Sequence, residues 1–210
     1  GTVNNRTFTP NVWGDVTVNI NGGNITNVYG GNDQMGNPRK GDVVYLNGGT
    51  IGNVYGGGNN TGQTTTNVYL QGSTVTNNIY GGSNNSGNVT TTNVTATSGS
   101  VKNIFGGNNA GGTVTTTNVN FNGATITGDI YGGGNEASCA TTNVTLTSGT
   151  VNDIYGGGYA AGVTTGTNVT VLSGTADQVF GGSNTSGSVP QTRVISGVST
   201  GTNGNIVIDQ

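Results

Sequence analysis

Only a few side chains in this sequence have the chemistry for catalysis or metal binding. The chain has no histidine, five Lys or Arg and eight Asp or Glu among 210 residues. Asp129 and Asp153 occupy the same place in two successive repeats, so a repetitive fold would set their carboxylates ~4.8 Å apart. Such a pair could hold a metal ion or act in acid–base catalysis, because neighbouring carboxylates shift each other's pKa. We favour the simpler interpretation, in which Asp replaces Asn in a polar ladder.

A second candidate site is an aromatic residue followed by two glycines. A phosphate cradle would need the pattern G-x-G-x-x-G between a strand and a helix, and no helix-forming segment follows here. The calcium-binding pattern G-G-x-G-x-D is closer, but asparagine replaces its acidic ligand at Asn59, Asn84, Asn135 and Asn184. We therefore expect no cofactor, with calcium as a minor alternative, and interpret the glycines as tight corners. The aromatics are Tyr29, Tyr55, Tyr80, Phe105, Tyr131, Tyr155 and Phe180.

A run of threonines is the sharpest candidate for a binding surface. Pairs of Thr recur in register, broken where Ala140 precedes Thr142. If the pairs point outward, they form a flat and uncharged grid of hydroxyl and methyl groups. Thr is also simply a good strand residue, and a bend between Val89 and Val94 leaves the direction of each Thr open. The candidate surface contacts are Thr64, Thr66, Thr90, Thr92, Thr115, Thr117, Thr142, Thr165 and Thr167.

Two columns of asparagine are predicted to be structural. Asn side chains stacked from coil to coil can hydrogen-bond to each other and fix the register. One column consists of Asn67, Asn93, Asn118, Asn143 and Asn168. The other lies just before the aromatic corner and consists of Asn27, Asn53, Asn78, Asn103, Asp129, Asp153 and Gln178. Cys139 falls in an apolar column, which predicts a buried free thiol.

The spacing of these motifs predicts the fold. Successive aromatics of the corner motif are 26, 25, 25, 26, 24 and 25 residues apart. A near-constant period in this range is typical of a solenoid. Short apolar pieces such as Val68-x-Leu70 alternate inward and outward residues, as strands do. We therefore predict an all-β fold, a single-stranded parallel β-helix that we expect to be right-handed, with about seven coils of ~25 residues and three short strands per coil.

Composition agrees with this fold and excludes several function classes. The chain has 42 Gly, is 30% hydrophobic and only 6% charged, with a net charge of −3. Its many Val, Ile and Thr residues argue against disorder. Five cations are too few for nucleic-acid binding, and no apolar run is long enough to cross a membrane. The start lacks the pattern of a signal peptide, so an export signal would have been removed or lie outside this sequence.

The ends of the chain depart from the repeat. Residues 1–13 are predicted to cap the first coil, residues 14–195 to form the solenoid, and residues 196–210 to form a last strand, a cap or a continuation. An insertion at 32–41 replaces the Thr run of an early coil and should protrude as a loop, which would serve binding or be merely tolerated. The lack of a polar helical cap leads us to expect that the natural chain continues beyond these termini.

With its unit written as G-T-V-x-D-I-Y-G-G-G…T-T-N-V-T-L-T-S, the chain resembles the glycine- and threonine-rich parallel β-helix repeats of bacterial surface adhesins, including autotransporter-like passengers. The resemblance covers residues ~14 to ~195 and is specific for architecture. The Thr columns resemble, less closely, the T-x-T face of ice-binding β-solenoids. A fold shared with pectate-lyase-like enzymes implies no activity.

We therefore predict a secreted or cell-surface module that is structural or adhesive and not an enzyme. Its flat faces would offer Thr, Asn and Tyr to a host or environmental glycan or protein surface, or to a neighbouring solenoid module, with no role for nucleic acid or membrane insertion. The alternative is ice binding through the Thr columns. A third hypothesis is an enzyme that acts on polysaccharide, although the sequence has no clustered acidic site of the usual kind.

Overall fold

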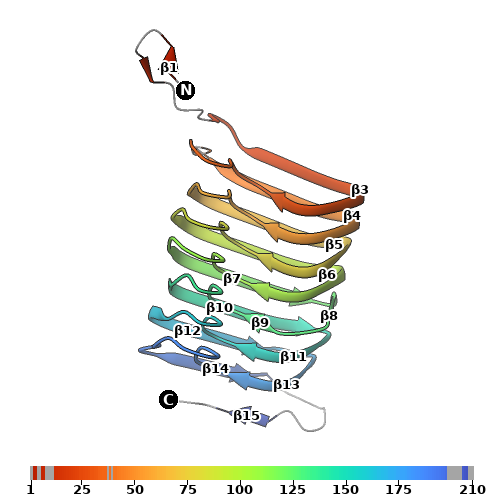
Figure 1. Ribbon diagram of the computed structural model, residues 1–210. Coiled ribbons are helices and arrows are strands. Elements are labelled where there is room, and N and C mark those ends of the chain that lie inside the picture. Colours follow the sequence, from red (N-terminus) through yellow and green to blue (C-terminus); the bar gives the residue numbers. More distant parts are fainter. Residues whose placement is uncertain are drawn as a thin grey trace.

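The computed structural model shows a β-solenoid of about seven turns, in which coils of about 25 residues stack one on the next (Figure 1). None of the described residues lies in a helix, and parallel pairing joins 13 strands through the stack. The predicted fold class is therefore confirmed. The structure describes residues 2–3, 6–7, 12–36, 38, 40–197 and 205–207.

Each strand pairs with the equivalent strand of the next coil, so residues about 25 apart in sequence lie side by side. β1 and β2 are the exception, because they form a separate antiparallel pair. The strands are β1 (Thr2–Val3), β2 (Arg6–Thr7), β3 (Val16–Tyr29), β4 (Gly41–Tyr55), β5 (Gln63–Tyr80), β6 (Val89–Phe105), β7 (Val114–Asn122), β8 (Thr125–Ile126), β9 (Ile130–Tyr131), β10 (Cys139–Ser148), β11 (Thr150–Tyr155), β12 (Val163–Val171), β13 (Thr175–Phe180), β14 (Thr192–Ser196) and β15 (Asn205–Val207).

One coil consists of two strand segments that enclose a narrow apolar core. In β6, Val94 and Ala96 point inward from the first segment, and Val101 and Ile104 point inward from the second; all four are at most 1% exposed. Gly99 turns the chain between the segments with φ 86°, a conformation that disfavours other residues. Because the same apolar positions recur in each coil, the core is continuous along the stack.

The strands differ in length from the three short pieces predicted for each coil. The Thr run and the apolar piece after it form one strand, as in β5 and β6, and only the coil of β7, β8 and β9 contains three strands among the coils described. Val89 and Thr92 are both buried although they are three residues apart, which breaks the two-residue alternation of a straight strand, so a bend does intervene there. Neighbouring coils bend at the same place, and coil-to-coil pairing therefore continues through it.

The first glycine of each corner in the inner coils is required by the next coil. The N–H of Gly106 donates to the carbonyl of Tyr131 at 2.9 Å. A Cβ atom on Gly106 would lie 2.2 Å from the carbonyl oxygen of Gly132, well inside any real contact. Corner glycines in the other inner coils face equivalent carbonyls of the following coil. The motif that resembled a ligand loop is therefore a steric requirement of coil stacking.

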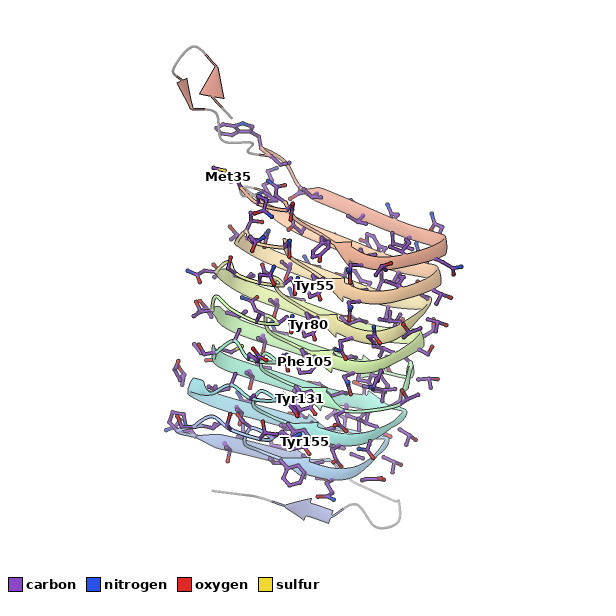
Figure 2. All side chains as sticks on the ribbon, viewed as in Figure 1. Met35, Tyr55, Tyr80, Phe105, Tyr131 and Tyr155 are labelled. Atoms are coloured by element: carbon purple, nitrogen blue, oxygen red, sulfur yellow. The ribbon has the colours of Figure 1, made fainter. Side chains whose placement is uncertain are left out.

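The structure describes the predicted end segments only in part. Much of 1–13 and of 196–210 lies outside the described residues. In the insertion at 32–41, Met35 is exposed (Figure 2). Asp33 and Gln34 are exposed as well, as expected, and Pro38 is buried, whereas Asn37 and Arg39 lie outside the described residues. Within the described part of the chain, there is no helix with the length and hydropathy needed to cross a lipid bilayer.

Gly106→Ala should destabilise the protein by about 1–3 kcal/mol, because the new methyl group must push the next coil away. Gly182→Ala, at the second corner glycine of the last described corner, is the control, since a Cβ there would meet no atom of the described residues within 4 Å. Denaturant unfolding followed by circular dichroism measures both variants. Equal loss of stability in the two would show that coil contact is not the reason for the glycine.

Candidate binding face

The structure divides the threonines that the sequence grouped together. In five coils one Thr is fully buried or nearly so, at 0% exposure in four of them and 2% in the fifth. Its hydroxyl donates to the carbonyl of the first corner glycine of the same coil, as Thr117 does to Gly132 at 2.5 Å. The buried set is Thr66, Thr92, Thr117, Thr142 and Thr167. The prediction that these five contact a partner at the surface is therefore wrong.

The reason is strand parity. Thr92 precedes Val94 by two residues, so both side chains point to the same side of the strand, which is the core. The remaining predicted contacts lie at the bend, two residues before the buried threonine of the same coil, and are exposed. They are Thr64, Thr90, Thr115 and Thr165. Their position at the surface agrees with the prediction, and their role in binding stays a prediction.

A different set of side chains forms a flat surface on the first segment of each coil. These residues alternate with the buried ones and are half-exposed or exposed. They stack in three columns along β4, β5, β6, β7, β10 and β12. We name this surface the outer face: Tyr45, Thr65, Asn67, Tyr69, Thr91, Asn93, Thr95, Thr116, Asn118, Asn120, Thr141, Asn143, Thr145, Asn168 and Thr170. All of them are uncharged.

The middle column of the outer face is the predicted asparagine ladder. Asn93 donates from Nδ2 to Oδ1 of Asn67 at 3.0 Å, and Asn118 donates in the same way to Asn93 at 2.9 Å. Asn143 and Asn168 continue the chain of bonds at 3.0 Å each. Each inner amide thus donates to one neighbour and accepts from the other, which fixes its orientation. The structural role predicted for this column is confirmed.

The tyrosines of the outer face present little ring surface to a ligand. Tyr45 and Tyr69 are stacked with ring centroids 5.1 Å apart and planes 13° from parallel. Because the rings lie face to face along the solenoid axis, each covers a face of the other. A sugar would therefore meet mainly ring edges and hydroxyl groups, which hydrogen-bond but do not provide a flat stacking platform.

The seven-membered aromatic column of the corner motif is a buried stack. Tyr55, Tyr80, Phe105, Tyr131 and Tyr155 are between 4% and 9% exposed, and Figure 2 shows them one above another. Ring centroids along the column are 4.6 to 5.1 Å apart. The end members Tyr29 and Phe180 are half-buried. The column is therefore part of the packing and not a sugar-facing stripe.

Corner loops cover this aromatic column. Tyr159 packs edge-on against Tyr131 with centroids 5.8 Å apart, and Asn184 donates to the Tyr131 hydroxyl at 3.3 Å. Burial raises the pKa of the Tyr55 hydroxyl to about 12 and also raises the pKa of Tyr131. The tyrosines therefore remain neutral throughout the physiological range.

The two aspartates proposed as a possible site are members of the second ladder. Oδ1 of Asp129 accepts from the backbone N–H of Asp153 at 3.2 Å and from Nδ2 of Asn152 at 2.8 Å, while Oδ2 accepts from the Tyr131 hydroxyl at 2.9 Å. Partial burial and the neighbouring Asp129 raise the pKa of Asp153. No group of three or more His, Cys, Asp or Glu that could hold a metal occurs among the described residues.

Asn–Asn hydrogen bonds join two further pairs of that column, as Asn53 donates to Asn27 at 3.1 Å and Asn103 donates to Asn78 at 2.9 Å. The column is interrupted between these pairs, where Asn78 donates to the Tyr80 hydroxyl at 2.9 Å. Cys139 is 2% exposed beside Val89 and Val114, as predicted from its column. Burial raises the pKa of its thiol to about 12, so it is an unreactive packing group.

Sequence reasoning missed a third ladder, on the corner loops. Side-chain bonds of 2.7 to 3.0 Å join Asp33, Asn59, Asn84, Asn109 and Asn135 in order. The signal was present, because these residues follow the corner glycines at the same period. From the sequence, Asn59, Asn84 and Asn135 are interpreted only as replacements for calcium ligands, and no role is assigned to Asp33 or Asn109.

Comparisons with protein-family models, with curated proteins and with solved structures found no match to this chain. The fold and the outer face are therefore the basis for any functional inference.

Thr117→Val should lower the free energy of unfolding by about 1–3 kcal/mol, because the carbonyl of Gly132 loses its buried donor while the side-chain volume is kept. Thr116→Val, on the outer face of the same strand, is the control and should change stability by less than about 0.5 kcal/mol. Thermal or denaturant unfolding of both variants checks this. Equal effects would contradict the inward role of the second threonine.

Proposed function

We propose that this protein is a non-enzymatic structural and adhesive module of the cell surface or extracellular space, which contacts its partner through the outer face. The observation that supports this most directly is the chemistry of that face. Six successive strands present mainly Thr, Asn and Tyr side chains in aligned columns, with Val43 in β4 and no charged residue among them, and the asparagine column ends at Arg193 of β14. The arrangement is typical of a surface that contacts an extended and neutral partner.

The outer face is also rigid. Its asparagines are held by coil-to-coil hydrogen bonds, and its threonines project from a strand whose other side is the packed core. Binding therefore requires little ordering of side chains, which reduces the entropic cost of association. Because equivalent groups recur in each coil, weak contacts act together and produce avidity.

Hydroxyl, amide and methyl groups define the class of partner. They donate and accept hydrogen bonds without charge, which suits a hydroxyl-rich glycan or the neutral surface of a protein or another solenoid. Of these, a neutral polysaccharide fits best, since a long polymer can contact several coils at once. The edge-on tyrosines Tyr45 and Tyr69 would contribute hydroxyl groups.

The double variant Thr91→Lys and Thr141→Lys places a cation in two alternate coils of the outer face. We expect retention on arrays of neutral glycans and on matrix proteins to fall at least tenfold, because desolvating an unpaired charge is costly. The matched control is Thr125→Lys with Thr175→Lys, exposed positions two coils apart on the second segment. Equal loss in both variants, or no retention of the parent protein on any surface, would count against the proposal.

Ice binding is a second candidate, supported by one observation. In β6 and β10, outward threonines flank the ladder asparagine two residues away on either side, as Thr91 and Thr95 flank Asn93. The two threonines of such a row are four residues and thus ~13 Å apart, and the rows of β6 and β10 are two coils or ~9.6 Å apart, because Asn120 occupies the third column in β7. The outward pairs therefore recur in alternate coils, and they are not the pairs first expected.

Thermal hysteresis of the purified protein tests this second candidate. If the outer face binds ice, Thr116→Tyr should abolish hysteresis, because a bulky ring disrupts the flat surface, and Thr125→Tyr should leave it unchanged. Absence of hysteresis in the parent protein would eliminate ice binding and leave the adhesive proposal unaffected.

A further inference from the structure

Asp42 is an exception to the hydrogen bonding of the solenoid. It is the second residue of β4 and its side chain is 0% exposed. Neither carboxyl oxygen has a hydrogen-bond partner, and no other buried side-chain oxygen or nitrogen of the described residues is in this state. A buried and unpaired carboxylate is costly, so its ionisation must be linked to the packing around it.

The position of Asp42 shows what it replaces. It pairs in register with Thr66, and the same column continues through Thr92, Thr117 and Thr142. The hydroxyl of each of these threonines donates a hydrogen bond to the carbonyl of a corner glycine 14 or 15 residues later. In the coil of Asp42, the equivalent carbonyl belongs to Gly56. A carboxylate has no proton to donate there, whereas a neutral carboxyl group has one.

Among the described residues, the strands that pack against Asp42 offer no opposite charge, and Arg39, three residues before it, lies outside the described residues. β3, β4 and β5 contain no Asp, Glu, Lys or Arg other than Asp42 itself. Their tyrosines are the other titratable groups, and Asp15, Asp33 and Lys40 on the flanking segments are exposed. Oδ2 of Asp42 and Nε2 of Gln63 both pack against the first-coil corner at Gly31, where a Cβ would lie 2.8 Å and 2.2 Å from them.

Gln63 is a second polar residue in the interior of the first coils, at a position that is apolar in later coils. It stands in the column that holds Val89, Val114 and Cys139 in the following coils. Its Nε2 donates to the Thr61 hydroxyl at 3.2 Å, and its Oε1 accepts from Ser83 at 3.2 Å. The start of the solenoid thus has a polar interior where the middle has an apolar one.

We propose that Asp42 is a proton-operated latch on the first two coils. With the proton in place, its carboxyl group donates to the Gly56 carbonyl as threonine does elsewhere, and β3 and β4 stay docked on β5. When the proton leaves, the unpaired charge draws water in between β4 and β5. β3 and β4 then separate from β5, while the coils from β6 onward remain stacked. The latch is independent of the adhesive proposal, although it would shorten the outer face by removing Tyr45.

The direction of the pH dependence follows from burial. Desolvation raises the pKa of Asp42 from 3.8 to about 7. The contribution of Asp42 to stability is therefore fully present below about pH 4, declines as pH rises through about 7, and stays lost above it. A shift of this size corresponds to a change of up to roughly a thousandfold in the opening equilibrium.

Hydrogen exchange with mass spectrometry between pH 4 and 8.5, corrected for intrinsic exchange, tests the latch on the full chain. We expect protection of peptides from β3 and β4 to fall by at least tenfold across this range, with β7 and β10 unchanged. Asp42→Asn and Asp42→Thr should remove the pH dependence, because neither side chain ionises. Asp33→Asn, which neutralises an exposed carboxylate of the first coil, should keep the parent profile.

Three outcomes would overturn the latch. One is the same pH profile in the parent protein and in Asp42→Thr, a variant that supplies the hydroxyl of the other coils and is expected to fold. Another is a carboxyl carbon resonance of Asp42 that titrates near 4 while β3 remains protected. The third is restored protection at pH 8 on adding Na⁺ or Ca²⁺ to the parent protein, which would show that a cation and not a proton neutralises Asp42.

Discussion

Parallel pairing of each coil with the next, in register, is the constraint on which the rest of this structure depends. A coil of about 25 residues cannot bury enough apolar surface to fold by itself, so each coil needs a neighbour with the same residues at the same places. Register then converts every repeated residue into a column. Valines form a continuous core, aromatic rings form a stack, and asparagines form ladders. The corner glycines obey the same constraint, since the backbone of the next coil occupies the space where their side chains would be.

Columns of one residue type explain how a chain that is only 30% hydrophobic maintains a defined fold. Polar side chains in register satisfy each other, as the amides of Asn93 and Asn118 do, so their burial carries little penalty. The inward threonines solve a related problem, because they supply donors to corner carbonyls that the sheet leaves unpaired. Asp42 departs from this rule, because its buried carboxyl oxygens have no hydrogen-bond partner.

The same constraint shapes the surface available to a partner. Since outward residues recur in register, the outer face is a regular lattice and not a pocket, and its contacts would be many and individually weak. The aromatic residues that would normally anchor a sugar are used instead in packing, either in the covered stack around Phe105 or face to face at Tyr45 and Tyr69. Recognition through this face would therefore depend on hydrogen bonding and shape across several coils.

The sequence by itself determined the period, the fold class, the glycine corners, the asparagine ladder at Asn93 and the buried thiol of Cys139, because each follows from local residue type repeated at a fixed spacing. It did not determine which threonine faces the core. Thr90 and Thr92 are both compatible with either side until the bend between them is placed, and that bend is set by pairing with neighbouring coils. Nor did it determine the environment of Phe105 or Asp42. Burial of the aromatic stack depends on loops that fold over it, and the isolation of the Asp42 carboxyl depends on the corner of another coil, which are contacts between residues distant in sequence that only the tertiary structure brings together.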